Sequence, residues 1–203
     1  DDEILSSQRV KLYANQFIML ISSSNPKKTA LARYIDKVHP LDKIRDRKHE
    51  TSWGILPRNK EQTFAFDLLF DDTIPFISLI GRAGSGKTLM AIAAGMEQTL
   101  GMHGNKYRKL VVSRPVQPMG KDIGFLPGDL KEKMMPWLAP IQDNLEMIIG
   151  QDKVVFQQFL EQGKIEIEAL TYIRGRSINN AFMIIDEAQN LTAHEVKTII
   201  TRV

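Results

Sequence analysis

The chain has 203 residues, of which 43% are hydrophobic and 25% charged, and its formal net charge is +3. This length suits one medium domain with an appendage, and the mild positive charge permits a polyanionic partner without requiring one. No apolar run is long enough to predict a membrane-spanning helix, and the absence of cysteine excludes a disulfide framework and a thiol-based metal site. The acidic, polar start DDEILSS is unlike a secretory signal. We therefore expect a cytoplasmic protein without membrane association.

The first part of the chain predicts a small β structure followed by a basic segment. Val10–Tyr13 and Gln16–Ile21 are rich in β-forming residues, and Ser22–Pro26 then interrupts regular structure. Residues 27–58 are the most basic stretch and have two interpretations, a surface that contacts phosphate backbones or a solvated linker. The mixture of lysine, arginine and interspersed acids favours the linker. Residues 1–52 are therefore expected to form a β-containing appendage and a basic connector.

The strongest local signal is a glycine-rich loop between a predicted strand and a predicted helix. The apolar run Phe76–Ile80 is followed by GRAGSGKT, which matches G-x-x-x-x-G-K-[ST], and then by a helical pattern. Glycines let the backbone turn so that its N–H groups face phosphate oxygens, and the next helix offers its positive end to the same anion. We expect Lys87 to reach the β- and γ-phosphates and Thr88 to ligate Mg²⁺. The alternative, a turn that binds nothing, fits this context poorly. The expected nucleotide-binding residues of the loop are Gly81, Arg82, Ala83, Gly84, Ser85, Gly86, Lys87, Thr88 and Leu89.

A helix is predicted just before this loop. Asn59 is a suitable N-cap for a helix that continues to Leu69. This helix carries Gln62, whose amide can accept a hydrogen bond from adenine N6 and donate one to N7. A surface glutamine is the usual explanation for such a residue alone. Beside the phosphate loop, Gln62 predicts an adenine contact.

The middle of the chain alternates strands and helices. Leu110–Pro115 predicts a strand, and the following residues 116–128 are rich in glycine and proline. Such a long loop is commonly functional, and it follows a strand at the edge where open α/β sheets bind ligands. Residues 129–149 predict a helix with breaks at Pro136 and Pro140. The remaining expected elements are a helix over residues 154–160 and a strand over residues 165–170.

A second nucleotide signal lies near the end of the chain. Phe182–Glu187 consists of four apolar residues and two acids, which is typical of a buried strand that carries carboxylates at its C-terminal end. We expect Asp186 to hold Mg²⁺ through water, Glu187 to polarise the attacking water, and Gln189 to sense the γ-phosphate. A helix N-cap or surface carboxylates are the alternative. Thr192–Thr201 predicts a helix that begins with a capping box.

Five segments together resemble the PhoH family of phosphate-starvation-inducible ATPases. They are WGILPRNKEQ, LIGRAGSGKTLMA, SRPVQPMGKDIGFLPGDLKEKM, YIRGRS and MIIDEAQNLTAHEVKTIITRV. The resemblance runs from about Trp53 to the end of the chain. It implies an α/β, RecA-like P-loop NTPase fold of the superfamily 1 helicase type, with a mostly parallel central sheet. It also implies hydrolysis of ATP to ADP with Mg²⁺, helicase-like association with single-stranded RNA, and a ring-shaped homo-oligomer.

The resemblance also assigns roles to individual residues. Gln62 is similar to the adenine-reading glutamine of the related helicases. Arg114 and the loop from Gln117 to Asp129, which contains Lys121, correspond to a nucleic-acid-facing motif. Arg174 and Arg176 belong to the family's RGR element and have the same expected role. Without the family, both would be interpreted as surface arginines.

The two ends of the chain qualify this picture. The first 50 residues resemble the connector of longer members, in which a PIN ribonuclease domain lies upstream. Residues 53–203 are expected to form the ATPase domain, truncated one helix after the second acidic motif, where the family normally continues. A nucleotide-binding assembly module with little turnover is therefore the alternative function. A small-molecule kinase is disfavoured, because a kinase needs neither the acidic pair followed by Gln-Asn nor the long GFLPGDL loop.

Overall fold

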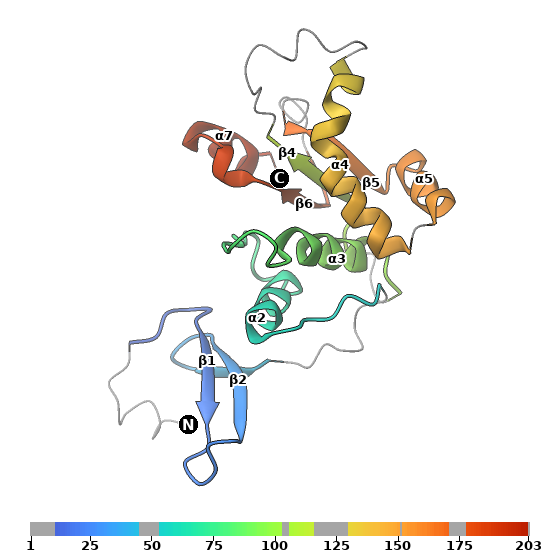
Figure 1. Ribbon diagram of the computed structural model, residues 1–203. Coiled ribbons are helices and arrows are strands. Elements are labelled where there is room, and N and C mark those ends of the chain that lie inside the picture. Colours follow the sequence, from blue (N-terminus) through green and yellow to red (C-terminus); the bar gives the residue numbers. More distant parts are fainter. Residues whose placement is uncertain are drawn as a thin grey trace.

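The computed structural model describes residues 11–44, 53–102, 106–115, 130–150, 152–170 and 178–202, with the backbone alone for residues 130–135. Two separate sheets are connected by helices (Figure 1). An antiparallel sheet forms one end of the molecule, and a parallel sheet with its covering helices forms the other.

The N-terminal sheet consists of β1 (Phe17–Ile21), β2 (Thr29–Tyr34) and β3 (Leu41–Lys43), in the order β1-β2-β3. The first strand confirms the run predicted at Gln16–Ile21, but residues 11–13 form no strand. The interpretation of residues 27–58 as a solvated linker is wrong for the part that forms β2 and β3. The many charged residues of this segment suggested exposure to solvent. Arg33 of β2 is nevertheless buried, with only 6% of its surface exposed.

Helix α2 (Lys60–Leu69) leads from this sheet toward the phosphate loop. Its N-cap is Asn59, whose side chain accepts a hydrogen bond from the backbone N–H of Gln62, as predicted. The strand predicted at Phe76–Ile80 is wrong, because these residues are in no regular secondary structure. Their side chains still alternate: Phe76 and Ile80 are 63% and 94% exposed, while Ile77 and Leu79 pack against the core. The apolar pattern is that of a strand, but a strand also needs a neighbouring backbone, and neither described sheet pairs with this run.

The parallel sheet has the order β5-β4-β6, formed by β4 (Lys109–Arg114), β5 (Ile165–Ala169) and β6 (Ala181–Ile185). Helix α3 (Lys87–Leu100) follows the phosphate loop and packs on β4 and β6. Gly95 permits this close packing, since a Cβ there would lie 2.7 Å from Cδ1 of Leu110. The α/β class and the parallel sheet are therefore confirmed.

Alternation along β4 divides the core into two layers. Leu110 and Val112 lie in the main cluster with the buried residues of α3 and α4. Val111 lies in a second cluster, to which Ile199 of α7 (Ala193–Ile200) contributes. Helices therefore cover both faces of the sheet, as expected for parallel strands.

The other helices follow the predicted pattern with one exception. Helix α4 (Leu130–Ile149) continues through Pro136 and Pro140, so the predicted breaks are wrong. Buried side chains at Ile141 and Leu145 hold the second half of the helix against the core, which compensates for the missing backbone donors. The remaining helical elements are α5 (Lys153–Glu161) and the short 3₁₀ helix η2 (Ala188–Asn190).

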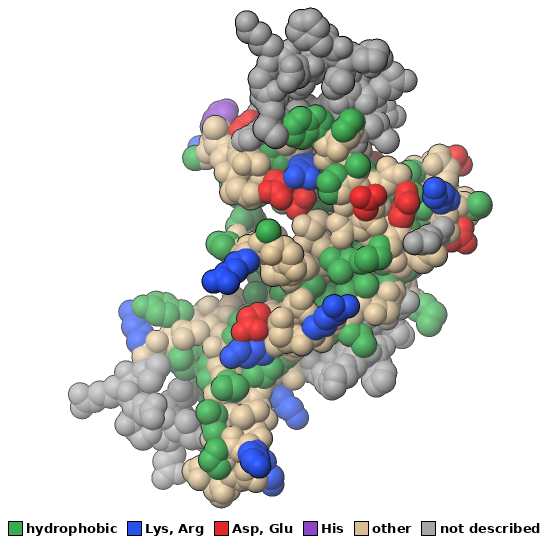
Figure 2. Space-filling model, in the orientation of Figure 1, with side chains coloured by type: hydrophobic (Ala, Val, Ile, Leu, Met, Phe, Trp, Pro, Cys, Tyr) green, Lys and Arg blue, Asp and Glu red, His purple; other side chains and the backbone are tan. Residues whose placement is uncertain are grey.

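Charge is distributed unevenly on the face of the molecule in Figure 2. Acidic side chains gather over the parallel sheet and α5, whereas Lys and Arg side chains are scattered over the N-terminal sheet and the nearby helices. Among the described residues on this face, the Lys and Arg side chains form no continuous basic patch. Among the described helices, none combines the length and apolar character that crossing a membrane would require.

Candidate nucleotide-binding site

The phosphate loop has the backbone geometry that its glycines predict. Gly84 and Gly86 have φ angles of +74° and +84°, in the left-handed region that other residues rarely adopt. Gly86 is also the N-cap of α3, so the loop leads directly into the start of a 14-residue helix. Backbone N–H groups at a helix N-terminus attract anions because they lack intrahelical partners. This arrangement is suited to binding phosphate.

The Lys87 ammonium folds back over the loop. Its Nζ donates hydrogen bonds of 2.9 Å to the carbonyl oxygens of Gly81 and Arg82. An ammonium group has three N–H donors, so one remains for a further acceptor. The cation is thereby held where a phosphate seated on the loop would lie.

The two sequence motifs meet at one hydrogen bond. The Thr88 hydroxyl donates to Oδ1 of Asp186 over 2.7 Å, although the residues are 98 positions apart in the chain. The backbone N–H of Asp186 donates to the carbonyl oxygen of Ser113, which fixes the acid at the carboxyl end of the sheet. The structure thus brings together both residues that the sequence predicts as magnesium ligands.

Glu187 has an unusual conformation beside this pair. Its φ of +53° and ψ of +38° are left-handed, which costs free energy for a residue with a Cβ and often marks a functional position. Gln189 donates its Nε2–H to Oε2 of Glu187, so two predicted catalytic residues contact each other. The other carboxylate oxygen lies 3.7 Å from the guanidinium of Arg114.

The position of Arg114 adds a contact that sequence reasoning missed. The sequence predicts Arg114 as a nucleic-acid-facing residue, whereas its guanidinium lies 4.0 Å from Asp186 and 3.7 Å from Glu187. The signal was present, because Arg114 ends β4 and the acids follow β6, and the carboxyl ends of neighbouring parallel strands share one edge. Arg114 thus contributes positive charge beside the acidic pair.

Gln62 lies against the phosphate loop. Its Nε2 donates to the carbonyl oxygen of Ser85 over 3.1 Å, and its Oε1 accepts from the backbone N–H of Arg58 over 2.7 Å. Each amide atom retains capacity for one more hydrogen bond. Gln62 can therefore contact an adenine edge without losing its place beside the loop.

The oxygen donors at this site fit magnesium. Mg²⁺ in nucleotide sites is commonly held by one or two protein oxygens together with phosphate oxygens and water. Thr88 and Asp186 supply a hydroxyl and a carboxylate within hydrogen-bond distance of each other. In the described ranges, no cluster of three or more His, Asp and Glu side chains offers a cage made by protein alone. A metal here would need ligands from the nucleotide.

Three of the predicted site residues cannot be placed. Lys121 lies in the long loop after β4, and Arg174 and Arg176 lie between β5 and β6; all three are outside the described residues. The described nucleotide site therefore consists of the loop, α2 and the ends of β4 and β6.

Comparison with known proteins agrees with these motifs. Residues 54–203 match the family described as PhoH-like protein. The chain is 49% identical to Protein PhoH2 of Bacillus subtilis over 195 residues, which cover 94% of this chain and 43% of that protein. It is 39% identical to Protein PhoH2 of Thermobispora bispora over 152 residues, covering 74% of this chain and 34% of that protein. The chain is 42% identical to a PhoH-like protein of Synechocystis over 123 residues, which cover 61% of this chain and 36% of that protein. The chain spans less than half the length of these relatives. It belongs to the PhoH-like family, a family of P-loop proteins that generally bind ATP.

Proposed function

We propose that this chain binds Mg·ATP between the phosphate loop and the end of β6 and hydrolyses it to ADP and phosphate. The observation that carries the proposal is the 2.7 Å hydrogen bond between Thr88 and Asp186, which joins the two halves of the site. A glycine-rich turn with only a structural role would not need a carboxylate there. A helix N-cap role for Asp186 is also disfavoured, since no described helix begins at the next residue.

The chain's own groups divide the work at the phosphates. The backbone N–H groups of the phosphate loop and of the start of α3 bind the phosphate oxygens, and the Lys87 ammonium adds positive charge at the β- and γ-phosphates. Thr88 and Asp186 would hold Mg²⁺. When bound, the ion would neutralise charge that develops on the phosphate oxygens during transfer.

Glu187 is the proposed group that orients the attacking water. Its left-handed backbone directs the carboxylate away from the regular continuation of β6, and Gln189 holds one carboxylate oxygen. The γ-phosphate would compete with Glu187 for the Gln189 amide, so hydrolysis would change the contacts of Gln189. This is a route by which loss of phosphate can alter the loops that follow β4 and β6.

Several finer parts of the proposal rest on the family resemblance. We infer a RecA-like core of the superfamily 1 helicase type, cytoplasmic, acting on single-stranded RNA as a ring-shaped homo-oligomer, with a PIN ribonuclease domain upstream in longer members. Membership of the PhoH-like family supports these inferences. The scattered basic side chains in Figure 2 add no support for RNA.

A nucleotide-binding assembly module with little turnover is the second candidate. The contacts of Glu187 favour it, because both carboxylate oxygens already lie near donors from Gln189 and Arg114. A carboxylate engaged in this way has fewer lone pairs left to hold an attacking water. Measurement of turnover separates the two candidates.

The test is phosphate release from Mg·ATP, with and without single-stranded RNA. Lys87→Ala and Glu187→Gln are the site variants, and Lys60→Ala and Glu61→Gln are matched controls on exposed residues of α2. The proposal expects release that RNA stimulates and that only the two site variants lose. ATP binding that requires Lys87 but gives no release would favour the assembly module. Binding that survives Lys87→Ala would contradict both.

A further inference from the structure

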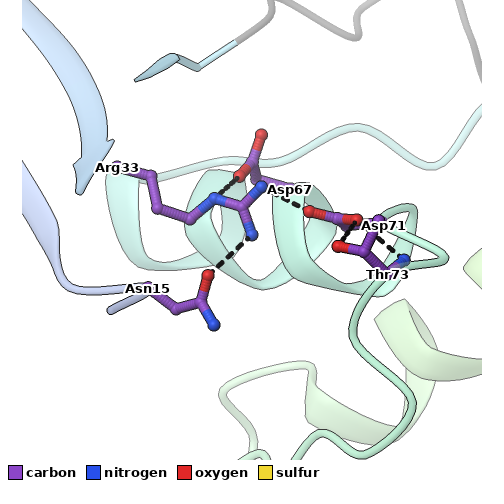
Figure 3. Close-up of polar contacts among 5 residues, drawn as sticks. All are labelled: Asn15, Arg33, Asp67, Asp71 and Thr73. Carbon is purple, nitrogen blue, oxygen red and sulfur yellow. Dashed lines mark hydrogen bonds and ion pairs between the residues drawn. The ribbon is translucent and has the colours of Figure 1, made fainter. Parts of the chain in front are cut away.

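The N-terminal sheet contacts helix α2 and its C-terminal end through a charge cluster of Arg33, Asp67 and Asp71. Arg33 of β2 lies with its Nε 3.1 Å from Oδ2 of Asp67 and its second terminal nitrogen 2.5 Å from Oδ2 of Asp71 (Figure 3). The remaining terminal nitrogen donates to the side-chain oxygen of Asn15 over 3.3 Å. Asp71 is held further by the backbone N–H and hydroxyl of Thr73. The two terminal nitrogens of the guanidinium thus donate hydrogen bonds, whereas Nε lies at ion-pair distance from Asp67 without hydrogen-bond geometry.

An aromatic contact also joins the N-terminal sheet to α2, from the neighbouring strand β1. The rings of Phe17 on β1 and Phe64 on α2 are stacked, with centroids 4.3 Å apart and planes 8° from parallel. Phe64 lies three residues before Asp67 in α2, so the stack and the ion pair with Asp67 contact successive turns of the helix. Phe17 and Arg33 are directly opposite each other in the β1–β2 pair, so an aromatic contact and an ion-pair contact with α2 arise from neighbouring positions of the sheet.

The other side of α2 is fixed to the nucleotide site. At its first turn, Gln62 donates to the carbonyl oxygen of Ser85 in the phosphate loop. At its last turn, the carbonyl oxygen of Leu69 accepts a 2.9 Å hydrogen bond from Gln98 of α3. Helix α2 therefore lies between the N-terminal sheet and the loop–α3 unit, in contact with both (Figure 1).

The residues of the cluster are better suited to orienting α2 than to stabilising its contact with the sheet. Asp67 lies in the last turn of α2 and Asp71 follows the C-cap Phe70, so one planar guanidinium contacts both the helix and the residues at its C-terminal end. This arrangement fixes the rotation of α2 about its axis as well as its distance from β2. A buried ion pair contributes little net stability compared with apolar packing, because removing charges from water is costly. What it supplies here is a defined orientation of the helix that carries Gln62.

We propose that Arg33 and Phe17 are positioning residues for recognition of the nucleotide base, acting through α2 on Gln62. This rests on the proposed ATP site, and it makes the N-terminal sheet a working part of that site. Gln62 distinguishes adenine from guanine by accepting from an exocyclic amine where guanine has a carbonyl. Selectivity of this kind needs the amide held in place, so a helix that can rotate loses preference before it loses phosphate binding.

The test measures the dissociation constants of the 203-residue chain for Mg·ATP and Mg·GTP, together with the melting temperature. The variants are Arg33→Lys, which keeps the charge but loses the planar fork, and Phe17→Leu, which loses the stack. Gln62→Ala defines complete loss of the base contact. Phe159→Leu on α5 is a matched control that also removes a partly buried ring, but away from α2.

The wild-type chain should prefer ATP, and both variants should reduce the ATP-to-GTP preference by about two- to tenfold, the value of one neutral hydrogen bond. Phe159→Leu should leave the ATP-to-GTP preference unchanged. The double variant Arg33→Lys with Gln62→Ala should lose no more of this preference than Gln62→Ala alone. A lower melting temperature with an unchanged ratio would overturn the inference and leave the ATP site standing. A wild-type chain that fails to bind ATP would overturn the proposed function and this inference with it.

Discussion

Two clusters in this chain each contain one arginine and two carboxylates, but their geometry differs. Arg33 contacts Asp67 and Asp71 at 3.1 and 2.5 Å, and its side chain is 7% exposed. Arg114 lies 4.0 and 3.7 Å from Asp186 and Glu187, and its side chain is 23% exposed. One cluster is closed and buried, whereas the other is open and partly solvated.

The spacing of the acids explains the difference. Asp67 lies in the last turn of α2 and Asp71 just beyond its C-cap, and a single guanidinium contacts both. Asp186 and Glu187 are consecutive residues after β6, and Glu187 has a left-handed backbone. Each then finds its closer partner elsewhere, in Thr88 and in Gln189. The closed cluster is suited to holding β2 against α2 permanently, whereas the open cluster leaves its carboxylates available for a metal ion and a water molecule.

The largest expected effect comes from removing each arginine in turn. Arg33→Ala should lower the free energy of unfolding by about 3 kcal/mol, because it leaves the buried carboxylate of Asp67 and the partly buried one of Asp71 without their cation. Arg114→Ala should lower it by about 1 kcal/mol or less, as is usual for long, partly solvated ion pairs. Denaturant unfolding monitored by tryptophan fluorescence measures both.

Equal losses for the two variants would contradict the comparison. Lys43→Ala, on exposed β3 of the same sheet as Arg33, is the control for a general effect of removing a cation there.

Acid should open the closed cluster. Burial acts to raise the pKa of Asp71, but hydrogen bonds from Thr73 and Arg33 and the charge of Arg33 outweigh it, so the pKa lies below its ordinary value of 3.8. A carboxyl with a lowered pKa in the folded state stabilises the fold above its ordinary pKa, and this contribution is lost as the pH falls through the lowered value. Asp71→Asn should therefore cost about 1 to 3 kcal/mol at pH 7, as for a hydrogen bond to a charged group. The difference from wild type should shrink below about pH 4.

Unfolding at pH 7 and at pH 3 provides the measurement. A difference between wild type and Asp71→Asn that grows toward low pH would show that the sign of this contribution is wrong.

The smallest expected effect concerns the open cluster. Glu187→Gly should raise the free energy of unfolding by up to about 1 kcal/mol, because glycine adopts a left-handed backbone without a steric cost. The same variant should abolish phosphate release under the proposed function. Asn180→Gly, at another left-handed position, should change stability less, since asparagine tolerates this conformation. Destabilisation by Glu187→Gly would mean that the contacts of its side chain outweigh the backbone strain.

Local sequence patterns predicted the parts of the fold that depend on local chemistry. The caps at Asn59 and Thr192, the left-handed glycines of the loop and the acid-terminated strand β6 are all found where expected. These features follow from steric and hydrogen-bonding preferences of a few adjacent residues, so a single sequence suffices to find them.

Features that depend on distant partners were missed. Phe76–Ile80 has the composition of a strand but no paired neighbour among the described residues, and Pro140 lies inside a helix that packing sustains. Arg33 looked like one cation in a solvated linker, because its two acids are 34 and 38 positions away. The contact of Arg114 with the acidic pair likewise depends on strand order, which periodicity alone does not reveal.

The central claim is that Thr88 and Asp186 together hold Mg²⁺ for ATP, and the measurement that tests it most directly is ATP affinity with Mg²⁺ and with EDTA. Thr88→Val keeps the side-chain shape and removes only the hydroxyl, Asp186→Asn removes the charge, and Thr198→Val on α7 is the matched control. The account predicts that Mg²⁺ strengthens ATP binding in wild type and in the control, and that this gain falls about tenfold or more in both site variants. An unchanged gain in Thr88→Val and Asp186→Asn would contradict it.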